Sequence, residues 1–506
     1  MGVARTFVDC LRLRYHDRFS PEKLQRFQIR LLRRLVAFAK KNSPFYAKLY
    51  SSVDPHSDGF SPQSLPPVTK EMLMENFDDV VTDGRINLKE VMEWVRRKDN
   101  IGDFYLSRYI VTHTSGTTGT PAYFVYDKRE WDMIQALGVT RGMRYKPGFF
   151  ELLRHAGRVL VRPPRIALVS VLGGHFVTYL LFRITPALAR RLSRFLFVQV
   201  TDPVDSIVAR LNDFQPNILH IYPTMLEVLA HEKLEGRLQI SPWAISTSSE
   251  PLTPNAARII KKAFPDSRLF ETYGTTEGVT LACGCSGGEA THINSDYYVL
   301  EPVMEDGSPA EAGRAADRVY MTCLFARTMP LIRYELSDVT IPLDGECPCG
   351  LSFPRLKVRG RTDDVFWVDG PRGEHVALPP IPLEAMLLEV EGLRQYQVVQ
   401  EGRNELRVAF IPQQGFDADG VRRRIEKAFE SFLGLKELSG VVRVRVEQVK
   451  EIERDPESGK IRQIYSKVGR PFLPGRPLGD RRTGEDRRTR QNAVEPDRRK
   501  GERRKT

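Results

Sequence analysis

A regular alternation of short apolar runs and helical patterns between residues 164 and 274 constrains the fold of this chain more than any other feature. Apolar runs occupy residues 164–172, 216–223, 242–252 and 268–274, and segments with helical spacing lie at 185–197, 224–234 and 253–264. Strands that alternate with helices favour a parallel β-sheet with helices on its faces. With 506 residues, the chain is also long enough for two or three domains with a large buried core.

The pattern changes on both sides of this region. Residues 24–42 carry apolar side chains every three to four positions, which predicts an amphipathic helix that stops at Asn42–Pro44. Beyond residue 360 the segments become shorter, with helices expected at 381–393 and 420–434 and strands at 396–402, 405–412 and 442–449. This change is typical of a separate α+β domain of about 100 residues.

We therefore expect an α/β protein with three parts. Residues 1–360 form a large N-terminal domain with parallel sheets flanked by helices, and residues 361–470 form a small C-terminal α+β domain. Residues 471–506 lack apolar periodicity and repeat the pattern Asp/Glu-Arg-Arg four times. That composition is typical of a disordered basic tail.

Positive charge is concentrated in this tail. Residues 475–506 hold twelve Lys/Arg against six Asp/Glu, a net charge of +6, which is half of the +12 of the whole chain. The rest of the chain is only mildly basic, which argues against a nucleic-acid-binding groove in its body. Because residues 475–506 have no aromatic residue to stack on bases, we expect no specific nucleic-acid partner. A solvated extension and a weak electrostatic contact with an anionic surface are the two interpretations of the tail.

Targeting and membrane signals are weak. The first 18 residues are basic and lack the apolar run of a signal peptide. The longest apolar stretch, residues 166–182, contains two glycines and a histidine and falls short of the ~20 apolar residues of a membrane span. It predicts a buried strand followed by a helix. Six cysteines, four of them in two Cys-x-Cys pairs, suit a reducing cytosol and a metal better than disulfides, so we expect a cytoplasmic protein.

The segment from Thr112 to Phe124, "THTSGTTGTPAYF", is rich in hydroxyl groups and glycine. Glycines allow backbone N–H groups to turn toward an anion, and Ser and Thr hydroxyls add donors without bulk. Such a loop suits the outer phosphates of a nucleotide, although it lacks the Gly-Lys-Ser/Thr ending of a P-loop. The alternative is a polar β-hairpin turn.

Four further motifs follow along the chain. "ETYGTTEG" at 271–278 offers an aromatic ring for a base, hydroxyls for a phosphate and a carboxylate for Mg²⁺. The others are Asp338 in "LIRYELSDVT", "RGRTDD" at 359–364, and Lys460 in "DPESGKIRQ". Taken singly, each of these is more often a solvated turn residue than part of a site.

The order of these five motifs resembles the adenylate-forming (acyl-CoA synthetase) superfamily. The order runs Ser-Gly-Thr-Thr-Gly, Tyr-Gly-x-Thr-Glu, Arg-Tyr-x-x-x-Asp, Gly-Arg-x-Asp-Asp and Gly-Lys, over about 350 residues. Within the superfamily, the segments "AKKNSPFYAKLY", "LPPVTKEML" and "IYPTMLEVLA" are similar to the phenylacetate–CoA ligase-like branch. The resemblance covers roughly residues 25–470 and leaves the tail unexplained.

The resemblance implies an AMP-forming acyl- or aryl-CoA ligase, an acid–thiol ligase. Its substrate is a small-molecule carboxylic acid and its cofactors are ATP, Mg²⁺ and CoA. A carboxylate is a poor electrophile, and attack on the α-phosphorus of ATP converts it into an acyl-adenylate with AMP as leaving group. Two alternatives stay open: an adenylate-forming enzyme that passes the acyl group to a protein thiol or an amine, and a non-catalytic nucleotide-binding scaffold.

The resemblance also assigns roles to single residues on the nucleotide side. The loop residues Ser115, Gly116, Thr117, Thr118 and Gly119 would hold the β- and γ-phosphates, and Ser249 with Glu250 would form the adenine-side loop. Tyr273 would stack on adenine, Thr276 would contact the α-phosphate and Glu277 would hold Mg²⁺. Asp338 would bind the ribose hydroxyls with help from Arg361. Thr120 departs from the pattern, because many members carry Lys at that position.

The remaining roles concern the small domain, which the resemblance implies is mobile. Asp363 would be the hinge, and Gly370 would let the carrier thiol approach in the second half-reaction. Lys460 would bridge the carboxylate and the α-phosphate. Because three like-charged groups must meet, Mg²⁺ and Lys460 would neutralise them. A lysine on a mobile domain can be withdrawn afterwards, which suits a two-step enzyme.

Four cysteines and one histidine form a further constellation. Cys283, Cys285 and His292 lie in "ACGCSGGEATHIN", and Cys347 and Cys349 lie in "GECPCGLSFPR". These soft ligands are enough for a tetrahedral structural Zn²⁺ site. Some phenylacetate–CoA ligase-like proteins have a similar arrangement, which Cys285, His292, Cys347 and Cys349 match best, with Cys283 as an alternate. The other interpretation is a group of free buried thiols; Cys10 and Cys323 have no partners in this pattern.

Two other features have two interpretations each. His175, in "GGHF", either lines the acid pocket, which the superfamily places near this region, or is a hydrogen-bonded core histidine. The helix expected at 185–197 carries Arg190, Arg191 and Arg194 opposite apolar residues. That arrangement is typical of a solvated face and is also compatible with a membrane-surface contact.

Overall fold

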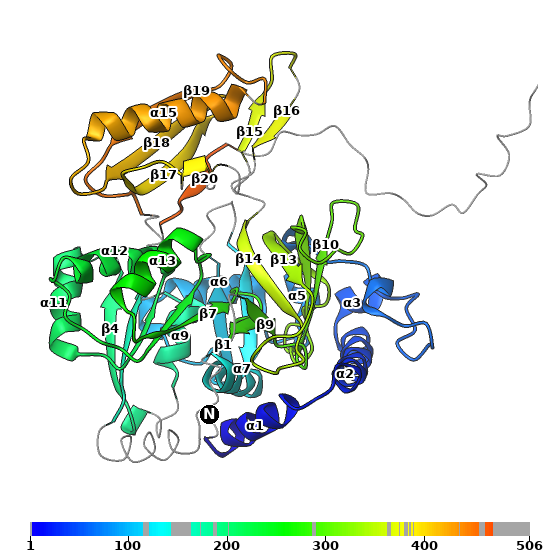
Figure 1. The fold of residues 1–506 in the computed structure, drawn as a ribbon. Helices are drawn as coiled ribbons and strands as arrows, with labels where there is room; N and C mark the ends of the chain where they lie inside the picture. The colour runs from blue at the N-terminus through cyan, green and yellow to red at the C-terminus, as the bar shows by residue number, and fades with distance from the viewer. Residues whose placement is uncertain are drawn as a thin grey trace, which may run out of the picture. The chain divides into compact units, whose positions relative to one another are not determined.

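The structure is a computed structural model with two units, Met1–Val468 and Gly469–Thr506 (Figure 1). It describes residues 3–114, 121–142, 163–172, 174–185, 190–200, 202–285, 290–361, 366–373, 375–378, 383, 386–387, 389–434, 436–454 and 461–468. The expected disordered tail, 471–506, lies outside the described residues. The predicted boundary between residues 360 and 361 stays a prediction.

The N-terminal region is helical. It begins with α1 (Val3–His16) and α2 (Pro21–Asn42), so the predicted helix over 24–42 is confirmed with one additional turn at its start. Ser20 caps α2 by accepting a hydrogen bond from the Lys23 backbone N–H, and Ser43 caps the next helix, which has Pro44 in its first turn. The region continues through α3 (Pro44–Leu49), η1 (Pro62–Ser64), α4 (Lys70–Glu75), α5 (Phe77–Val80), α6 (Leu88–Arg96) and η2 (Lys98–Asn100).

A hairpin and a long helix follow. The hairpin strands β1 (Tyr109–His113) and β2 (Tyr123–Asp127) are antiparallel and flank the predicted phosphate loop. Helix α7 (Lys128–Arg141) starts directly after β2, where Asp127 and Glu130 form a capping box. A separate antiparallel sheet consists of β10 (Tyr298–Val303), β11 (Arg318–Cys323) and β12 (Tyr334–Leu336).

The largest sheet of the described residues has the strand order β13-β14-β9-β8-β7-β6-β5-β3-β4. Its parallel half comprises β3 (Arg165–Ser170), β4 (Arg194–Gln199), β5 (Ile218–Ile221), β6 (Ala244–Ser248) and β7 (Arg268–Tyr273). Antiparallel strands extend it: β8 (Ala282–Gly284), β9 (Thr291–Ile293), β13 (Asp338–Leu343) and β14 (Arg355–Arg361). The predicted α/β fold class is confirmed.

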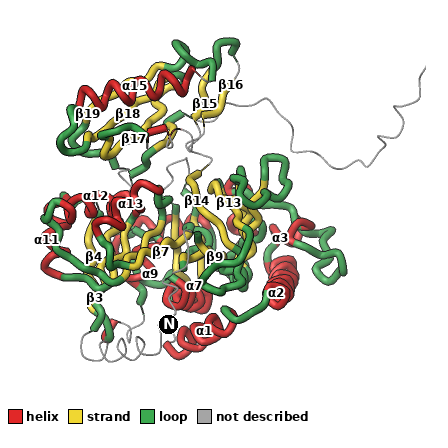
Figure 2. Tube along the Cα trace, viewed as in Figure 1, coloured by secondary structure: helices red, strands yellow, loops and turns green. Residues whose placement is uncertain are grey.

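Helices connect the parallel strands and flank the sheet (Figure 2). They are α9 (Val177–Arg183), α11 (Val204–Phe214), α12 (Pro223–Leu234) and α13 (Pro254–Ala263). Apolar side chains from these helices, such as Leu211, Met225 and Ile260, pack against Ile221 and Ile245 of the strands. Burial of this apolar surface is the main stabilising contribution in this half of the sheet.

One predicted element is wrong in its C-terminal part. The helix expected over 185–197 is a strand from Arg194 onward, because β4 pairs in parallel with β3 at the end of the sheet order. Phe195, Phe197 and Val198 are aromatic or β-branched and suit a strand. Arg190 and Arg191 precede the strand, so the three arginines do not share one helix face.

The long apolar stretch behaves as predicted. Residues 166–182 fall into strand β3 followed by helix α9, as expected. None of the helices in the described parts of the chain combines the length and the apolar character that a membrane crossing requires.

The region after residue 365 contains a smaller α+β arrangement with its own apolar core. Strands β17 (Leu393–Gly402), β18 (Glu405–Pro412) and β19 (Arg443–Gln448) and helix α15 (Ala418–Gly434) confirm the predicted elements. Strand β20 (Ile464–Ser466) completes the sheet order β19-β18-β17-β20, and β15 (Phe366–Asp369) pairs with β16 (His375–Leu378). The helix expected over 381–393 lies largely outside the described residues.

Candidate active site

Several predicted nucleotide-side residues follow the carboxyl ends of two neighbouring parallel strands. Ser249 and Glu250 come directly after β6, Tyr273 is the last residue of β7, and Thr276 and Glu277 lie in the turn that follows. In open α/β sheets, ligands bind outside the carboxyl ends of the strands. The topology therefore brings these five residues to the end of the sheet where such a ligand binds.

Tyr273 and Asp338 are in direct contact. The Tyr273 hydroxyl donates a 2.7 Å hydrogen bond to Oδ2 of Asp338, the first residue of β13. Strands β8, β9 and β14 stand between β7 and β13 in the sheet order, so the contact joins distant parts of the sheet. Arg361 is the backbone register partner of Asp338 in the β13–β14 pair. The predicted adenine and ribose residues are thus held together.

Two buried tyrosines hydrogen-bond to the backbone of the turn that carries Thr276 and Glu277. Tyr126 donates hydrogen bonds to the carbonyls of Thr276 (3.0 Å) and Glu277 (2.7 Å), and Tyr298 donates to the carbonyl of Gly278. Burial raises the pKa of the Tyr126 hydroxyl well above its ordinary value, so it stays protonated and can donate. The backbone carbonyls are used for support, and the Thr276 and Glu277 residues remain partly exposed to solvent.

The turn also requires glycine at two positions. A Cβ at Gly274 would lie 2.2 Å from the carbonyl oxygen of Val279, and one at Gly278 would lie 2.3 Å from the Leu281 side chain. The first clash is with backbone, which cannot move aside as the end of a flexible side chain can. The pattern Tyr-Gly-x-Thr-Glu-Gly thus has a steric reason as well as a chemical one.

The loop after β6 is held against the start of a helix. Glu250 Oε2 accepts hydrogen bonds from the Thr224 backbone N–H (3.1 Å) and hydroxyl (2.8 Å), in the first turn of α12. A carboxylate is stabilised at a helix N-terminus by the unpaired N–H groups there. Ser249 itself has a left-handed backbone with φ of 73°. Such a conformation is unfavourable for a non-glycine residue and is found where surrounding structure enforces it.

A buried polar row inside the parallel strands was missed by the sequence reasoning. His220 of β5 lies between two serines of β6, with Nδ1 3.2 Å from Ser246 Oγ and Nε2 3.0 Å from Ser248 Oγ. Burial lowers the pKa of His220 to about 4, so the ring is neutral near pH 7. At the ends of neighbouring strands, the hydroxyl oxygens of Ser170, the last residue of β3, and Tyr222, which follows β5, are 2.8 Å apart. The only sequence signal was a histidine within the apolar run "ILHIYP".

His175 lies in the core. Its Nδ1 is 3.2 Å from the carbonyl oxygen of Val111, and burial lowers its pKa to about 4. The hydrogen bond favours the core interpretation. Among the described residues, its Nε2 is buried and has no hydrogen-bond partner. Its role in an acid pocket stays a prediction.

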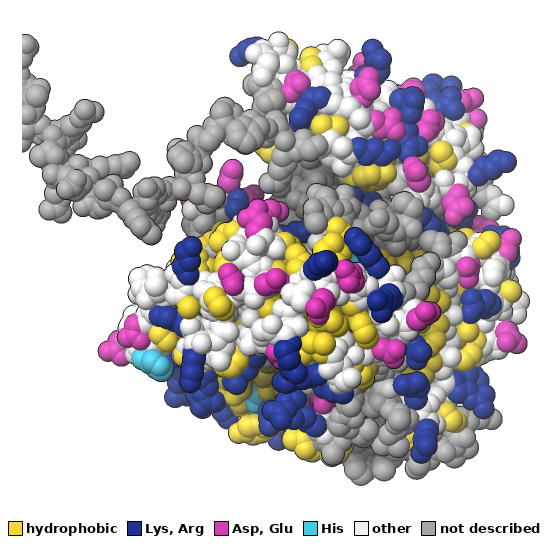
Figure 3. All heavy atoms as spheres, turned by 180° about the vertical axis from the view of Figure 1, so that it is seen from behind, with side chains coloured by type: hydrophobic (Ala, Val, Ile, Leu, Met, Phe, Trp, Pro, Cys, Tyr) yellow, Lys and Arg dark blue, Asp and Glu magenta, His cyan; other side chains and the backbone are white. Residues whose placement is uncertain are grey.

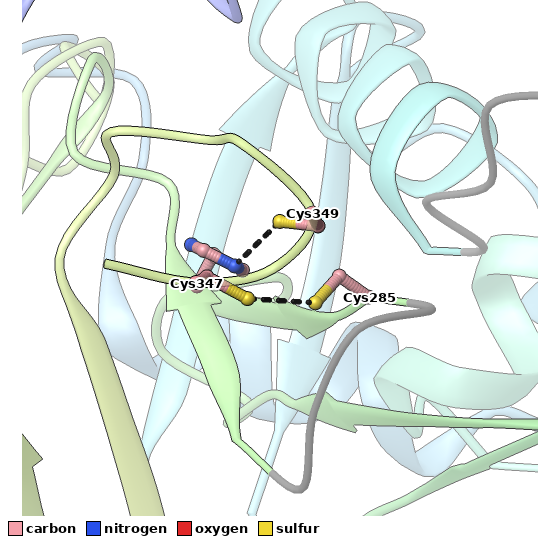
Figure 4. Close-up of side chains that lie close together, drawn as sticks. Cys285, Cys347 and Cys349 are labelled. Carbon is pink, nitrogen blue, oxygen red and sulfur yellow. Dashed lines mark hydrogen bonds between the residues drawn. The ribbon is translucent and has the colours of Figure 1, made fainter. Parts of the chain in front are cut away.

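The cysteine and histidine residues converge in a small cluster. Ligand atoms of Cys285, His292, Cys347 and Cys349 all lie within 4.8 Å of one another. Figure 4 shows the three cysteine sulfurs turned toward one another, with Cys285 Sγ 3.5 Å from Cys347 Sγ and Cys349 Sγ 3.3 Å from His292 Nε2. Burial raises the pKa of the Cys349 thiol to about 12.

The histidine of this cluster is oriented for metal binding. His292 Nδ1 lies 2.9 Å from the carbonyl oxygen of Phe353, so Nδ1 carries the proton and Nε2 presents its lone pair to the sulfurs. Cys283 is the backbone partner of His292 in the β8–β9 pair, but its Sγ instead accepts from the Asn294 side-chain amide at 3.9 Å. The four ligands named first are thus the set that the structure brings together, and Cys283 is not among them.

The sequence of this chain is similar to known enzymes. Residues 107–314 match the family of AMP-binding enzymes. The chain is 27% identical over 408 residues to a phenylacetate-coenzyme A ligase of Thermus thermophilus, which covers 75% of this chain and 78% of that protein. It is 23% identical over 338 residues to the protein CapK of Staphylococcus aureus, with 65% of each chain covered.

In sequence, the chain is similar to members of the adenylate-forming superfamily. A 2-hydroxyisobutyryl-CoA ligase in its postadenylation state, in complex with 2-HIB-AMP, shares this fold with a TM-score of 0.62 and 18% identity, covering 87% of this chain and 88% of that chain. The same ligase in an open conformation with 2-HIB-AMP and CoA matches with a TM-score of 0.51 and 19% identity, covering 86% of this chain and 90% of that chain. The resemblance to this superfamily and to phenylacetate–CoA ligases is confirmed, and these relatives support the predicted class of activity, the activation of an acid and its transfer to CoA.

Other residues expected from this superfamily are not placed. Ser115–Gly119 with Thr120, Asp363 and Lys460 lie outside the described residues. Of Arg361 only the backbone is described, as the last residue of β14. Gly370 follows β15 and is buried, and its carbonyl accepts a 3.0 Å hydrogen bond from the Gly373 backbone N–H. The roles assigned to these residues stay predictions.

Proposed function

We propose that this chain activates a carboxylic acid with ATP to give an acyl-adenylate and then transfers the acyl group to CoA. The observation that carries the proposal is the Tyr273–Asp338 hydrogen bond at the carboxyl end of β7. It joins the residue expected to stack on adenine to the residue expected to bind the ribose. Two groups predicted from separate motifs, 65 residues apart, would thus contact neighbouring parts of one nucleoside.

The residues of the following turn would act on the phosphates. The Thr276 hydroxyl would donate to the α-phosphate, and the Glu277 carboxylate would hold Mg²⁺, which would offset charge on the phosphates as the acid approaches. The Tyr126 and Tyr298 hydrogen bonds fix the backbone of this turn before substrate binds. A preformed arrangement needs little reorganisation in the transition state.

The small domain would act in both half-reactions. In the first, the acid carboxylate oxygen attacks the α-phosphorus and pyrophosphate leaves, and we propose that Lys460 neutralises charge in this step. Rotation about Asp363 would then withdraw Lys460, and Gly370 would let the CoA thiol reach the acyl carbon and displace AMP. The CoA-bound relative supports this choice of acceptor.

We also propose a structural zinc ion at the cysteine–histidine cluster. Three sulfurs and one imidazole nitrogen within 4.8 Å fit a tetrahedral site, whose Zn–S bonds are about 2.3 Å. Four protein ligands leave no open position for substrate, so the ion would support the fold. It would join β8, β9 and the turn before β14, next to the β7–β8 pair that contains Tyr273. The reduced thiols this requires agree with the proposed cytoplasmic location.

Pyrophosphate release tests the proposal directly. The protein would be incubated with ATP, Mg²⁺ and aryl, fatty and amino acids side by side, with hydroxylamine to trap the acyl-adenylate. We expect release with at least one acid, and a CoA-dependent thioester with the same acid. Hydroxamate without a CoA thioester would favour a protein thiol or an amine as acceptor. Folded protein that turns over no acid would favour the nucleotide-binding scaffold.

A further inference from the structure

The first helix exposes an apolar stripe. Phe7, Val8, Leu11 and Tyr15 of α1 are each between 51% and 62% exposed, and we call these four residues the α1 stripe. Their spacing places them on one face, since residues three to four positions apart lie on the same side of a helix. Val139 of α7, the helix against which α1 packs, is 70% exposed. Large apolar side chains gathered on a surface mark an interaction site.

The opposite face of α1 is firmly anchored, so the stripe is held facing outward. Leu13 and His16 are buried, and His16 Nδ1 lies 2.9 Å from Oδ2 of Asp296. Asp296 in turn receives two hydrogen bonds from the fully buried Arg141 of α7, at 2.6 and 2.8 Å. The exposure of the stripe is therefore a property of a docked helix.

Basic side chains lie along both sides of the stripe. Arg5 and Arg12 fall beside Val8 on the helix surface, Arg14 falls on the side of Phe7 and Leu11, and all three are exposed. Lys23 of α2 adds a cation directly over the stripe, with its Nζ 4.9 Å from the Tyr15 ring centre and 3.1 Å from the Tyr15 hydroxyl. The one acidic residue within α1, Asp9, is buried and pairs with Arg12 at 3.0 Å. The exposed face of α1 is thus apolar and cationic, with no exposed carboxylate.

We propose that the α1 stripe docks this enzyme on an anionic membrane surface. An interfacial helix places its apolar face at the boundary of headgroups and acyl chains, while flanking Arg and Lys bind anionic headgroups. Figure 1 shows α1 on the outside of the N-terminal region beside α7. On the opposite face of the molecule, basic and apolar side chains are interspersed with acidic ones (Figure 3). The α1 stripe is separate from the nucleotide site at the carboxyl ends of the strands.

Charge favours a membrane over a second copy of this chain. In a symmetric dimer through α1, the arginines beside each stripe would face the same arginines of the other copy. Like charges brought together at an interface are unfavourable, whereas anionic headgroups would neutralise them. A stripe of four side chains on a single helix is also small compared with the area that a stable protein interface requires.

Vesicle sedimentation of the full chain tests this proposal. Phosphatidylcholine vesicles with and without phosphatidylserine would be compared for the wild type and for the double variant Phe7→Ser/Leu11→Ser. We expect binding to the anionic vesicles that weakens as salt rises, and at least about a tenfold loss of affinity in the double variant. The matched control is Leu106→Ser/Leu234→Ser, which removes two leucines of 42% and 45% exposure elsewhere and should bind as the wild type does. All three proteins retain the basic tail, so their differences report on α1.

Other outcomes would overturn the proposal. Equal binding by the double variant would assign membrane binding to another surface, such as the tail. A wild type that does not bind anionic vesicles would refute the membrane as partner. A wild-type dimer in light scattering that the double variant converts to a monomer would assign the stripe to a second copy.

The charge variant Arg5→Glu/Arg14→Glu, which leaves the stripe intact, should lose binding to anionic vesicles as well.

Discussion

The hydroxyl of Tyr273 donates a 2.7 Å hydrogen bond to the Asp338 carboxylate and joins the end of β7 to the start of β13. Tyr273 is buried, so this bond restrains both the plane of its ring and the direction of the carboxylate. A nucleoside bound here would find its base platform and its ribose acceptor already oriented. Preorganisation of this kind lowers the cost of ordering side chains on binding.

The first prediction distinguishes the contribution of the Tyr273 ring to ATP binding from that of Asp338 and its hydrogen bond to Tyr273. Asp338→Ala should raise the KM for ATP by about tenfold to a hundredfold, because a charged hydrogen-bond acceptor is worth roughly 1.5–3 kcal/mol. Tyr273→Phe keeps the stacking surface and should raise it only a few-fold. Pyrophosphate release at varied ATP measures both variants.

Asp344→Ala is the matched control for the Asp338 variant. Asp344 directly follows β13 and its side chain is exposed, so its loss should leave the KM for ATP unchanged. An Asp338 variant that kept the wild-type KM for ATP would refute its ribose role. It would leave the Tyr273–Asp338 bond with a purely structural role.

The second prediction concerns Lys460. Lys460→Ala should abolish acyl-adenylate formation and largely spare thioester formation from a supplied acyl-adenylate, since the lysine is needed only where three anionic groups meet. The two half-reactions would be measured separately, by pyrophosphate release and by thioester yield. The neighbouring Lys467→Ala is the control. Equal loss of both half-reactions in the Lys460 variant would contradict the two-conformation scheme.

The third prediction is that protein purified without chelators contains about one zinc ion per chain. Cys285→Ser should remove most of the metal and lower Tm by several degrees, because binding of a structural ion contributes to the free energy of unfolding. Elemental analysis and a thermal scan measure the two effects. Cys10→Ser, outside the cluster, should keep both values. Metal-free wild-type protein would instead support a group of free buried thiols.

Helices, strands and site residues could be predicted from the sequence where a local pattern of side chains determines them. The apolar period identified α2, the strand–helix alternation identified β5, α12, β6 and α13, and the spacing of the cysteines identified a cluster that needs residues far apart in the chain. Each of these depends on side-chain periodicity or ligand chemistry, which the chain carries in its local order.

Elements that depend on tertiary context were not predicted. Residues 194–197 look helical beside their arginines, yet pairing with β3 makes them a strand, because tertiary contacts override weak local preferences. Strands β8, β9 and β14 are recognisable only through their partners, and so is the support of Thr276 by Tyr126, 150 residues away. The contacts of His220 with the serines of β6 depend on the pairing of β5 with β6, which no local pattern in the sequence indicates.

The fourth prediction concerns the buried pair Arg141–Asp296. Both side chains are fully buried, so Arg141→Met should remove the guanidinium that compensates the Asp296 carboxylate and lower the free energy of unfolding by about 3–5 kcal/mol. Urea titration measures this change. The control is Arg210→Met, because Arg210 pairs with Asp202 at an exposed position, where such a pair is worth about 1 kcal/mol or less.

The Arg141–Asp296 pair also predicts how the stability of the folded state changes with pH. Burial alone would raise the pKa of Asp296, but Arg141 and His16 outweigh it and lower the pKa from 3.8 to about 2. The ionised carboxylate therefore stabilises the folded state above pH 3.8, and this contribution is lost as the pH falls toward 2. Asp296→Asn should show a smaller loss of stability between pH 5 and pH 2 than the wild type. An identical pH profile would refute the assignment.

The fifth prediction is that deletion of residues 475–506 leaves pyrophosphate release and Tm unchanged. The last residue to which we assign a catalytic role is Lys460, and the deleted segment has no apolar periodicity with which to pack. Acidic residues precede each Arg pair of the tail and weaken its local positive potential, so its contact with anionic vesicles should be weak and lost with rising salt. The truncated protein should then keep most vesicle binding, because the α1 stripe remains. A truncated protein of normal Tm without activity would instead show that the tail reaches the active site, and the domain boundary at residue 471 would have to move.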